Sequence, residues 1–154
     1  MGYLTKYGSL WGMIPNTMGR VFFVAPSDSY SLEGRTYSSS NDNDGLSPER
    51  AVSTIARAAA LATLSGDVIF VLPATHTVTS AVTLSVAGVT VTGVPGPNPA
   101  FRDHGANAGV QARSMITASA ATVALNVTAT DVEICFVHFT AVSATRCIST
   151  ANTA

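Results

Sequence analysis

The stretch Val82-Thr-Leu-Ser-Val-Ala-Gly-Val-Thr-Val-Thr-Gly93 has a near copy at 124–136, Ala-Leu-Asn-Val-Thr-Ala-Thr-Asp-Val-Glu-Ile-Cys-Phe. Gly88 aligns with Asp131 at an offset of 43, and Val82 aligns with Ala124 at an offset of 42. Between the copies lies the 19-residue stretch 95–113, without which the offset of 43 becomes a period of 24. Short β-branched strands with tight turns at this period predict a β-solenoid, because a single coil cannot bury its own apolar face.

The composition places further bounds on the class of protein. A chain of 154 residues is long enough for one domain with a real core. Hydrophobic residues make up 47% and charged residues 11%, less than half the usual quarter. A surface with so little charge predicts that partners cover it or that the chain is part of a larger assembly.

Several partners and locations are disfavoured by the sequence. The net charge is −1, with a single lysine and seven scattered arginines, which argues against a nucleic-acid partner. No apolar run is long enough for a membrane span, and residues 1–18 do not have the pattern of a secretory signal. Cys135 and Cys147 are too few for a disulfide framework, and we interpret them as core residues in a reducing cytoplasm.

Residues 1–19 are predicted to form an extended anchoring arm. The segment is apolar and glycine-rich, and it has neither helical nor strand periodicity. It either lies on a partner or folds back over the core of its own domain. The partner-binding residues that we predict in this arm are Tyr3, Tyr7, Trp11, Met13 and Ile14.

Residues 20–66 are predicted to contain a first strand, a turn-rich segment and a capping helix. The strand covers 20–25, and the polar turn segment covers 38–45. Ser47-Pro48-Glu49 predicts the start of the helix, with serine as its N-cap, and Gly66 predicts its end. Such a helix would cover the exposed terminal edge of a solenoid. Its predicted inner face consists of Val52, Ile55, Ala56, Ala59 and Ala62.

Residues 67–154 are predicted to form the stacked coils, with a long loop at 95–113. Strands are expected at 67–72, 81–85, 89–92, 115–118, 124–127, 132–139 and 146–149. The residues expected to point inward are Val68, Phe70, Val89, Val91, Ile116, Leu125, Ile134 and Phe136. The sequence stops within what reads as another coil, so we expect either a longer natural chain or a partner subunit at this end.

The order of these segments resembles a known class of protein. Arg20-Val-Phe-Phe-Val, Asn41-Asp-Asn-Asp-Gly-Leu-Ser-Pro-Glu and Gly66-Asp-Val-Ile-Phe-Val-Leu-Pro together resemble the opening of right-handed parallel β-helix proteins, the pectate-lyase-like superfamily. Within that group, an apolar arm before an alanine-rich cap is most similar to bacteriophage virion proteins. The resemblance implies a homotrimer on a phage capsid or tail, and it says little about chemistry because this fold hosts many functions.

The sequence offers few groups for catalysis. Asp131 and Glu133 are two residues apart, so on a strand both carboxylates would share one face, as a catalytic pair or simply as a solvated one. Phe101 and Arg102, beside Asp103 and His104 on the long loop, could bind sugar or contact a neighbouring subunit, and we include both among the predicted partner-binding residues.

Metal and cofactor binding are not predicted. Ser40, Asp42 and Asp44 resemble the start of a Ca²⁺ loop, but Ala51 stands at the twelfth position where such a loop has glutamate, which favours an Asx-turn. His76 and His138 lie on separate predicted strands with no second ligand in view. The sequence contains no phosphate-loop, nucleotide or nucleophile motif.

From these observations we expect a non-enzymatic structural protein of a phage virion, a β-helical trimer attached through its N-terminal arm. It would be a capsid decoration or cement protein, or the anchoring part of a tail fibre or spike. Its partners would be copies of itself and other virion proteins, such as the major capsid protein or a tail adaptor. The alternative is a tailspike-like β-helix that binds or degrades polysaccharide.

Overall fold

The computed structural model describes residues 19–26, 29–32, 35–94, 113–119, 123–141 and 146–150. The predicted arm at 1–19 therefore lies outside the described residues except for Gly19, and the predicted loop at 95–113 lies outside them except for Arg113. Within the described residues the protein is mostly β, with parallel sheets and one α-helix.

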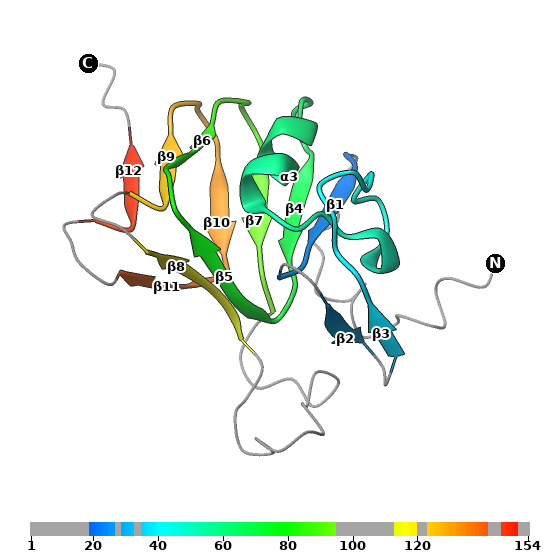
Figure 1. Cartoon of the computed structure of the whole chain (residues 1–154). Helices are drawn as coiled ribbons and strands as arrows, with labels where there is room; N and C mark the ends of the chain where they lie inside the picture. Colours follow the sequence, from blue (N-terminus) through cyan, green and yellow to red (C-terminus); the bar gives the residue numbers. More distant parts are fainter. Residues whose placement is uncertain are drawn as a thin grey trace.

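Three sheets form the body, and every strand pairing within them is parallel (Figure 1). The first sheet has the order β1 (Val21–Val24), β4 (Val68–Val71), β7 (Thr90–Thr92), β10 (Glu133–Cys135). The second has the order β5 (Ala74–Val78), β8 (Ser114–Ala118), β11 (His138–Ala141). The third has the order β6 (Val82–Leu84), β9 (Leu125–Val127), β12 (Ile148–Thr150). From β4 onward the chain thus visits the first, second and third sheets in turn, three times over.

The strand register confirms a sequence repeat, with small corrections to its predicted values. Val68 pairs with Thr90, 22 residues later, and Leu125 pairs with Ile148, 23 residues later, against the predicted period of 24. Val82 pairs with Leu125, so its offset is 43 and the predicted alignment with Ala124 is wrong by one residue. Thr90 pairs with Glu133, also at an offset of 43, so a single offset relates both strands of the first copy to those of the second.

Corners of one kind precede the strands of the first sheet. Gly66, Gly88 and Asp131 all have positive φ, at 87°, 72° and 55°. The corners are stacked, because the Gly66 N–H donates to the Gly88 carbonyl at 3.0 Å and the Gly88 N–H donates to the Thr130 carbonyl at 3.2 Å. Glycine adopts this conformation without steric cost, and aspartate is among the side chains that tolerate it best. The predicted alignment of Gly88 with Asp131 is therefore confirmed, because the two residues occupy equivalent corners.

The main apolar core lies between the three sheets. Val91, Ile116 and Leu125 are fully buried in it, as predicted. Ile134 lies on the edge strand β10 and is only half-buried. The prediction that Phe136 points inward is wrong, because the strand expected at 132–139 breaks there into β10 and β11. Phe136 forms the corner between these strands, with φ of 55° and 57% of its surface exposed.

A second apolar cluster covers the other side of the first sheet. It contains Phe23 and Phe70, whose ring centroids are 5.6 Å apart. The antiparallel hairpin of β2 (Tyr30–Leu32) and β3 (Arg35–Tyr37) contributes Tyr30 and Tyr37 at its margin. All four residues of β4 are buried as a result, which explains its continuous apolar sequence. Phe70 is therefore buried as predicted, but in this cluster instead of the core between the sheets.

The helix begins later than the sequence predicted. Pro48–Arg50 form a separate 3-10 turn, η1, and Ser47 makes no side-chain cap. The helix α3 (Ile55–Leu61) is instead capped by Thr54, whose Oγ1 accepts from the Arg57 N–H at 3.2 Å. Its buried residues are Ile55 and Ala58, and Ala56 is exposed against prediction. The helix packs against β1, β4 and β6, which are the earliest strands of the first and third sheets (Figure 1).

Candidate functional site

The residues predicted to bind partners are not placed by the structure. Tyr3, Tyr7, Trp11, Met13 and Ile14 lie outside the described residues, and so do Phe101 and Arg102. These seven residues therefore remain predictions, and the site has to be sought among the described strands, corners and loops.

The two acids of the last coil do not form an enclosed site. Asp131 stands at a corner and Glu133 begins β10, and both side chains are exposed. Asp103, the remaining acid of residues 68–154, lies outside the described residues. No group of three or more His, Cys, Asp or Glu side chains in the described part of the chain is placed to hold a metal ion. This geometry fits a solvated outer face better than a catalytic pair.

The loop at 40–45 uses its own oxygen atoms to hold its turns. Asp44 Oδ1 accepts from the Leu46 N–H at 3.1 Å, and Ser40 Oγ accepts from the Asp42 N–H at 3.1 Å. Asp44 also forms an ion pair with Arg50 at 3.2 Å. The Asx-turn favoured by the sequence is therefore confirmed, and the resemblance to a Ca²⁺ loop has a structural explanation.

The buried carboxylate of Asp67 accepts hydrogen bonds from two residues. Arg20 donates to it through Nη2 at 2.6 Å and Nε at 3.2 Å, and the backbone N–H groups of Arg20 and Leu64 donate at 3.0 Å each. Burial alone raises the pKa of Asp67, but the hydrogen bonds from Arg20 and Leu64 outweigh it and bring the pKa below its ordinary value. This pair serves to fasten the start of β1 to the start of β4.

The two described histidines have opposite surroundings within one sheet. His76 lies on β5 with 5% of its surface exposed, and its Nε2 lies 2.8 Å from the Leu72 carbonyl oxygen. Burial lowers the pKa of His76, and the hydrogen bond to Leu72 opposes this only in part. His138 lies on β11 and is exposed. As the sequence indicated, the two side chains do not share a site, because β8 separates their strands.

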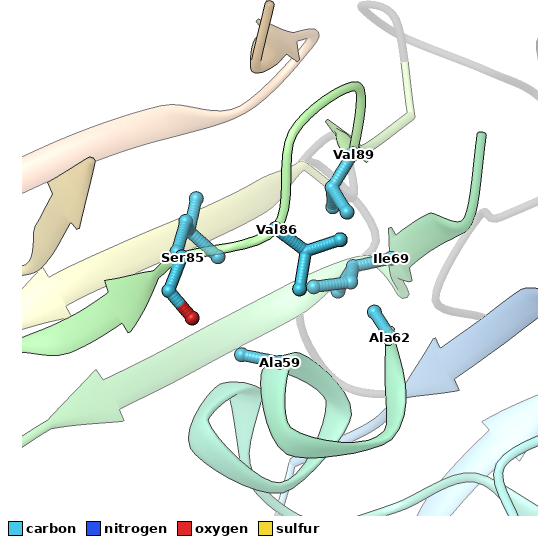
Figure 2. Close-up of a pocket in the computed structure, with 7 residues that line it drawn as sticks. Ala59, Ala62, Ile69, Ser85, Val86 and Val89 are labelled. Atoms are coloured by element: carbon cyan, nitrogen blue, oxygen red, sulfur yellow. The ribbon is translucent and has the colours of Figure 1, made fainter. Parts of the chain in front are cut away.

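A small hollow lies between α3 and the strands beside it (Figure 2). Ser85 supplies its one polar side chain, and no charged residue lines it. Ligand sites ordinarily combine apolar walls with a few converging polar groups, which this hollow lacks. We interpret it as imperfect packing of an alanine-rich helix on the sheets. The residues lining it are Ala59, Ala62, Ile69, Leu84, Ser85, Val86 and Val89.

Three large apolar side chains are exposed in the described residues: Leu46, Leu64 and Phe136. Phe136 is the most unusual, because a bulky residue with positive φ carries conformational strain as well as the cost of exposure. Nothing in the local sequence indicated this exposed corner, since an aromatic residue between cysteine and valine is typical of a strand interior.

The described architecture defines a mostly β protein built on parallel sheets. No protein-family model, no curated protein and no solved structure matches the chain. None of the described helices is long and apolar enough to cross a membrane.

Proposed function

We propose that the chain forms a right-handed parallel β-helix and serves as a non-enzymatic structural protein of a bacteriophage virion. The observation that carries the fold is the order of strands in the three sheets. Each sheet receives one strand from every passage of the chain, with partners 22 or 23 residues apart where the 95–113 stretch does not intervene. A chain that winds in this way stacks coils upon one another.

The position of α3 supports the same proposal. In a stacked-coil protein, the first coil leaves strand edges and apolar interior uncovered unless another element lies over them. The helix packs against β1, β4 and β6, and its buried side chains Ile55 and Ala58 join the core between the sheets. This packing supports a capping role for α3.

The distribution of charged residues favours a structural role over the polysaccharide-active alternative. Glycosidases of the usual kind need two carboxyl groups on opposite sides of the scissile bond. Asp131 and Glu133, the described acids that follow Asp67, are exposed neighbours at the start of one strand and at the corner before it. This arrangement favours a structural role, and the low content of charged residues favours a surface that other subunits cover.

The proposed assembly is a homotrimer that joins the particle through the arm at 1–19. Tyr3, Tyr7, Trp11, Met13 and Ile14 supply aromatic and apolar anchors, and ordering such a segment requires burial against a partner. The loop residues Phe101 and Arg102 would form a second contact. The partner is a major capsid protein or a tail adaptor, and the chain acts as a capsid decoration or cement protein or as the anchoring part of a tail fibre or spike.

Deletion of residues 1–18 tests this proposal. The shortened chain is expected to keep its β-rich circular dichroism and its oligomeric mass, and to stop co-sedimenting with particles that lack the protein. The substitution Trp11→Ala should weaken attachment by about 2 kcal/mol or more if Trp11 is a central anchor. A matched substitution, Thr83→Ala on the exposed side of β6, should leave attachment unchanged. Full occupancy by the shortened chain would refute attachment through the arm.

A further inference from the structure

His76 occupies a position on the inner face of the second sheet where the neighbouring coils carry apolar residues. Its Cα partner on β8 is Ile116, whose own partner on β11 is Phe139. Ile116 is fully buried in the core, and Val78, two residues from His76 on the same face of β5, also belongs to that core. A titratable ring therefore stands where packing alone would favour an aliphatic or aromatic side chain.

The hydrogen bond of His76 fixes the tautomer of its neutral ring. A carbonyl oxygen only accepts, so Nε2 must carry the proton that it donates to Leu72 at 2.8 Å. The neutral ring then leaves Nδ1 as the atom that would take up a second proton. An added charge at this position would be largely shielded from water, because only 5% of the residue surface is exposed.

Among the described residues, the elements around His76 supply no carboxylate to compensate that charge. The strands β8 and β6 contain no ionisable residue, and Arg113, just before β8, is an exposed cation. On the first sheet, Asp67 lies at the opposite end of β4 and is already paired with Arg20. The ionisable residue of α3 is Arg57, which is exposed and donates to the Asn41 carbonyl. His138 on β11 is exposed and two strands away.

We propose that His76 is an acid-sensitive switch, and that uptake of a proton at Nδ1 releases β5 from β8 and opens this edge of the second sheet. The strand is suited to local opening because, in the described residues, it pairs on one side only. The neutral ring stabilises the closed form fully above the ordinary pKa of histidine, about 6.5, and this contribution is lost as the pH falls below it. The inference goes beyond the proposed function and does not depend on attachment to a particle.

Hydrogen exchange followed by mass spectrometry tests this proposal on the whole chain. Protection of amides in β5 and β8 is compared at pH 7.5 and pH 5.0, after correction for the intrinsic effect of pH on exchange. One proton changes an opening equilibrium by a factor of about ten per pH unit, so the loss of protection between pH 6.5 and 5.0 should exceed about tenfold. At pH 5.0 carboxyl groups with ordinary or lowered pKa remain ionised, which isolates the histidine.

Two variants of His76 and one matched control decide the outcome. His76→Leu and His76→Gln cannot gain the proton, so the protection of both variants should change less than twofold with pH. The glutamine side chain retains an N–H donor, so His76→Gln serves as the test if His76→Leu does not fold. His138→Gln removes the exposed histidine of the same sheet and should behave as the unchanged protein. The proposal is overturned if the unchanged protein keeps its protection at pH 5.0, if the His76 variants lose protection equally, or if β1 and β4 lose it to the same extent as β5.

Discussion

The Arg20 guanidinium and the Asp67 carboxylate are 47 residues apart in sequence, and Arg20 Nη2 lies 2.6 Å from Asp67 Oδ2. Arg20 also donates to the Leu61 carbonyl at 3.3 Å and to Thr63 Oγ1 at 3.0 Å, immediately after α3. One side chain thus joins the start of β1, the start of β4 and the end of the helix. Arg20 remains partly exposed while Asp67 is fully buried. Loss of the pair would therefore leave the carboxylate buried without a compensating charge, whereas the guanidinium would still reach water.

Replacement of Arg20 should destabilise the fold more than replacement of an arginine in an exposed pair. Arg20→Ala leaves a buried carboxylate without its cation, whereas Arg50→Ala removes the solvent-exposed partner of Asp44 and should cost about 0.5 kcal/mol or less. Urea denaturation of both variants measures the difference in the free energy of unfolding. Equal midpoints for the two variants would contradict the importance assigned to this pair.

Acid should weaken the fold through Asp67 in a lower pH range than through His76. Because the pKa of Asp67 is lowered on folding, its contribution to stability is complete above the ordinary carboxyl value of about 3.9 and is lost as the pH falls below it. The free energy of unfolding should therefore decline again below about pH 4. In Asp67→Asn, which should be less stable at neutral pH, the step below pH 4 should shrink, and an unchanged step would assign it to other carboxyl groups.

The core between the sheets should tolerate a charge at its edge better than in its middle. Ile116→Asp places an unpaired charge in a fully buried position, which costs several kcal/mol and should unfold a domain of ordinary stability. Ile134→Asp is expected to cost less, because Ile134 on β10 is half-buried and its carboxylate could reach water. Circular dichroism and thermal unfolding of the two variants provide the comparison. A cooperatively folded Ile116→Asp protein would refute the stacked-coil proposal.

Phe136→Gly should leave stability unchanged or raise it by up to about 1.5 kcal/mol. Glycine removes the strain of a positive φ, about 1–2 kcal/mol, and adds about 0.5–1 kcal/mol of backbone entropy cost. Little burial is lost because the ring is largely exposed. Phe136→Ala is the control, since it removes the ring and keeps the strained backbone. Thermal unfolding should place the glycine variant above the alanine variant, and the reverse order would contradict the strain assigned to this corner.

No turnover of pectin or bacterial surface polysaccharide is expected. The double variant Asp131→Asn, Glu133→Gln should assemble like the unchanged protein, because both side chains are exposed and neither supports the core. Assays for reducing or unsaturated sugar ends provide the measurement. Sugar release that disappears in the double variant would favour the polysaccharide-degrading alternative.

The repeat and most strands could be predicted because local sequence patterns encode them. Gly88 and Asp131 mark corners, and a short run rich in β-branched residues follows each of them as a strand. The strand β5 was not predicted, because its outward threonines and its histidine hide the apolar face in the sequence Ala-Thr-His-Thr-Val. The hairpin of β2 and β3 was missed as well, since its strands have three residues each and show no clear alternation.

The helix start and the charged pair show what local patterns do not contain. Ser47-Pro48-Glu49 satisfies the usual start signals, yet the chain turns there and then forms a bridge between Val52 and Val24 before the helix begins. That bridge is a tertiary contact, and tertiary contacts override local preference. Likewise, nothing in the sequence around Arg20 or Asp67 indicates a partner 47 residues away.

The hydroxyl of Ser114 bridges the two sides of the long connection between β7 and β8. It accepts from the Val94 N–H at 2.9 Å and donates to the Val71 carbonyl at 2.7 Å, so the two flanks of residues 95–112 are fastened at one point. At the same corner the preceding coil needs only Leu72 and Pro73 between β4 and β5. The same corner therefore joins the first sheet to the second through connections of very different length while the strands stay paired. A foreign peptide exchanged for residues 95–112 should accordingly leave the pairing of β5 with β8 intact.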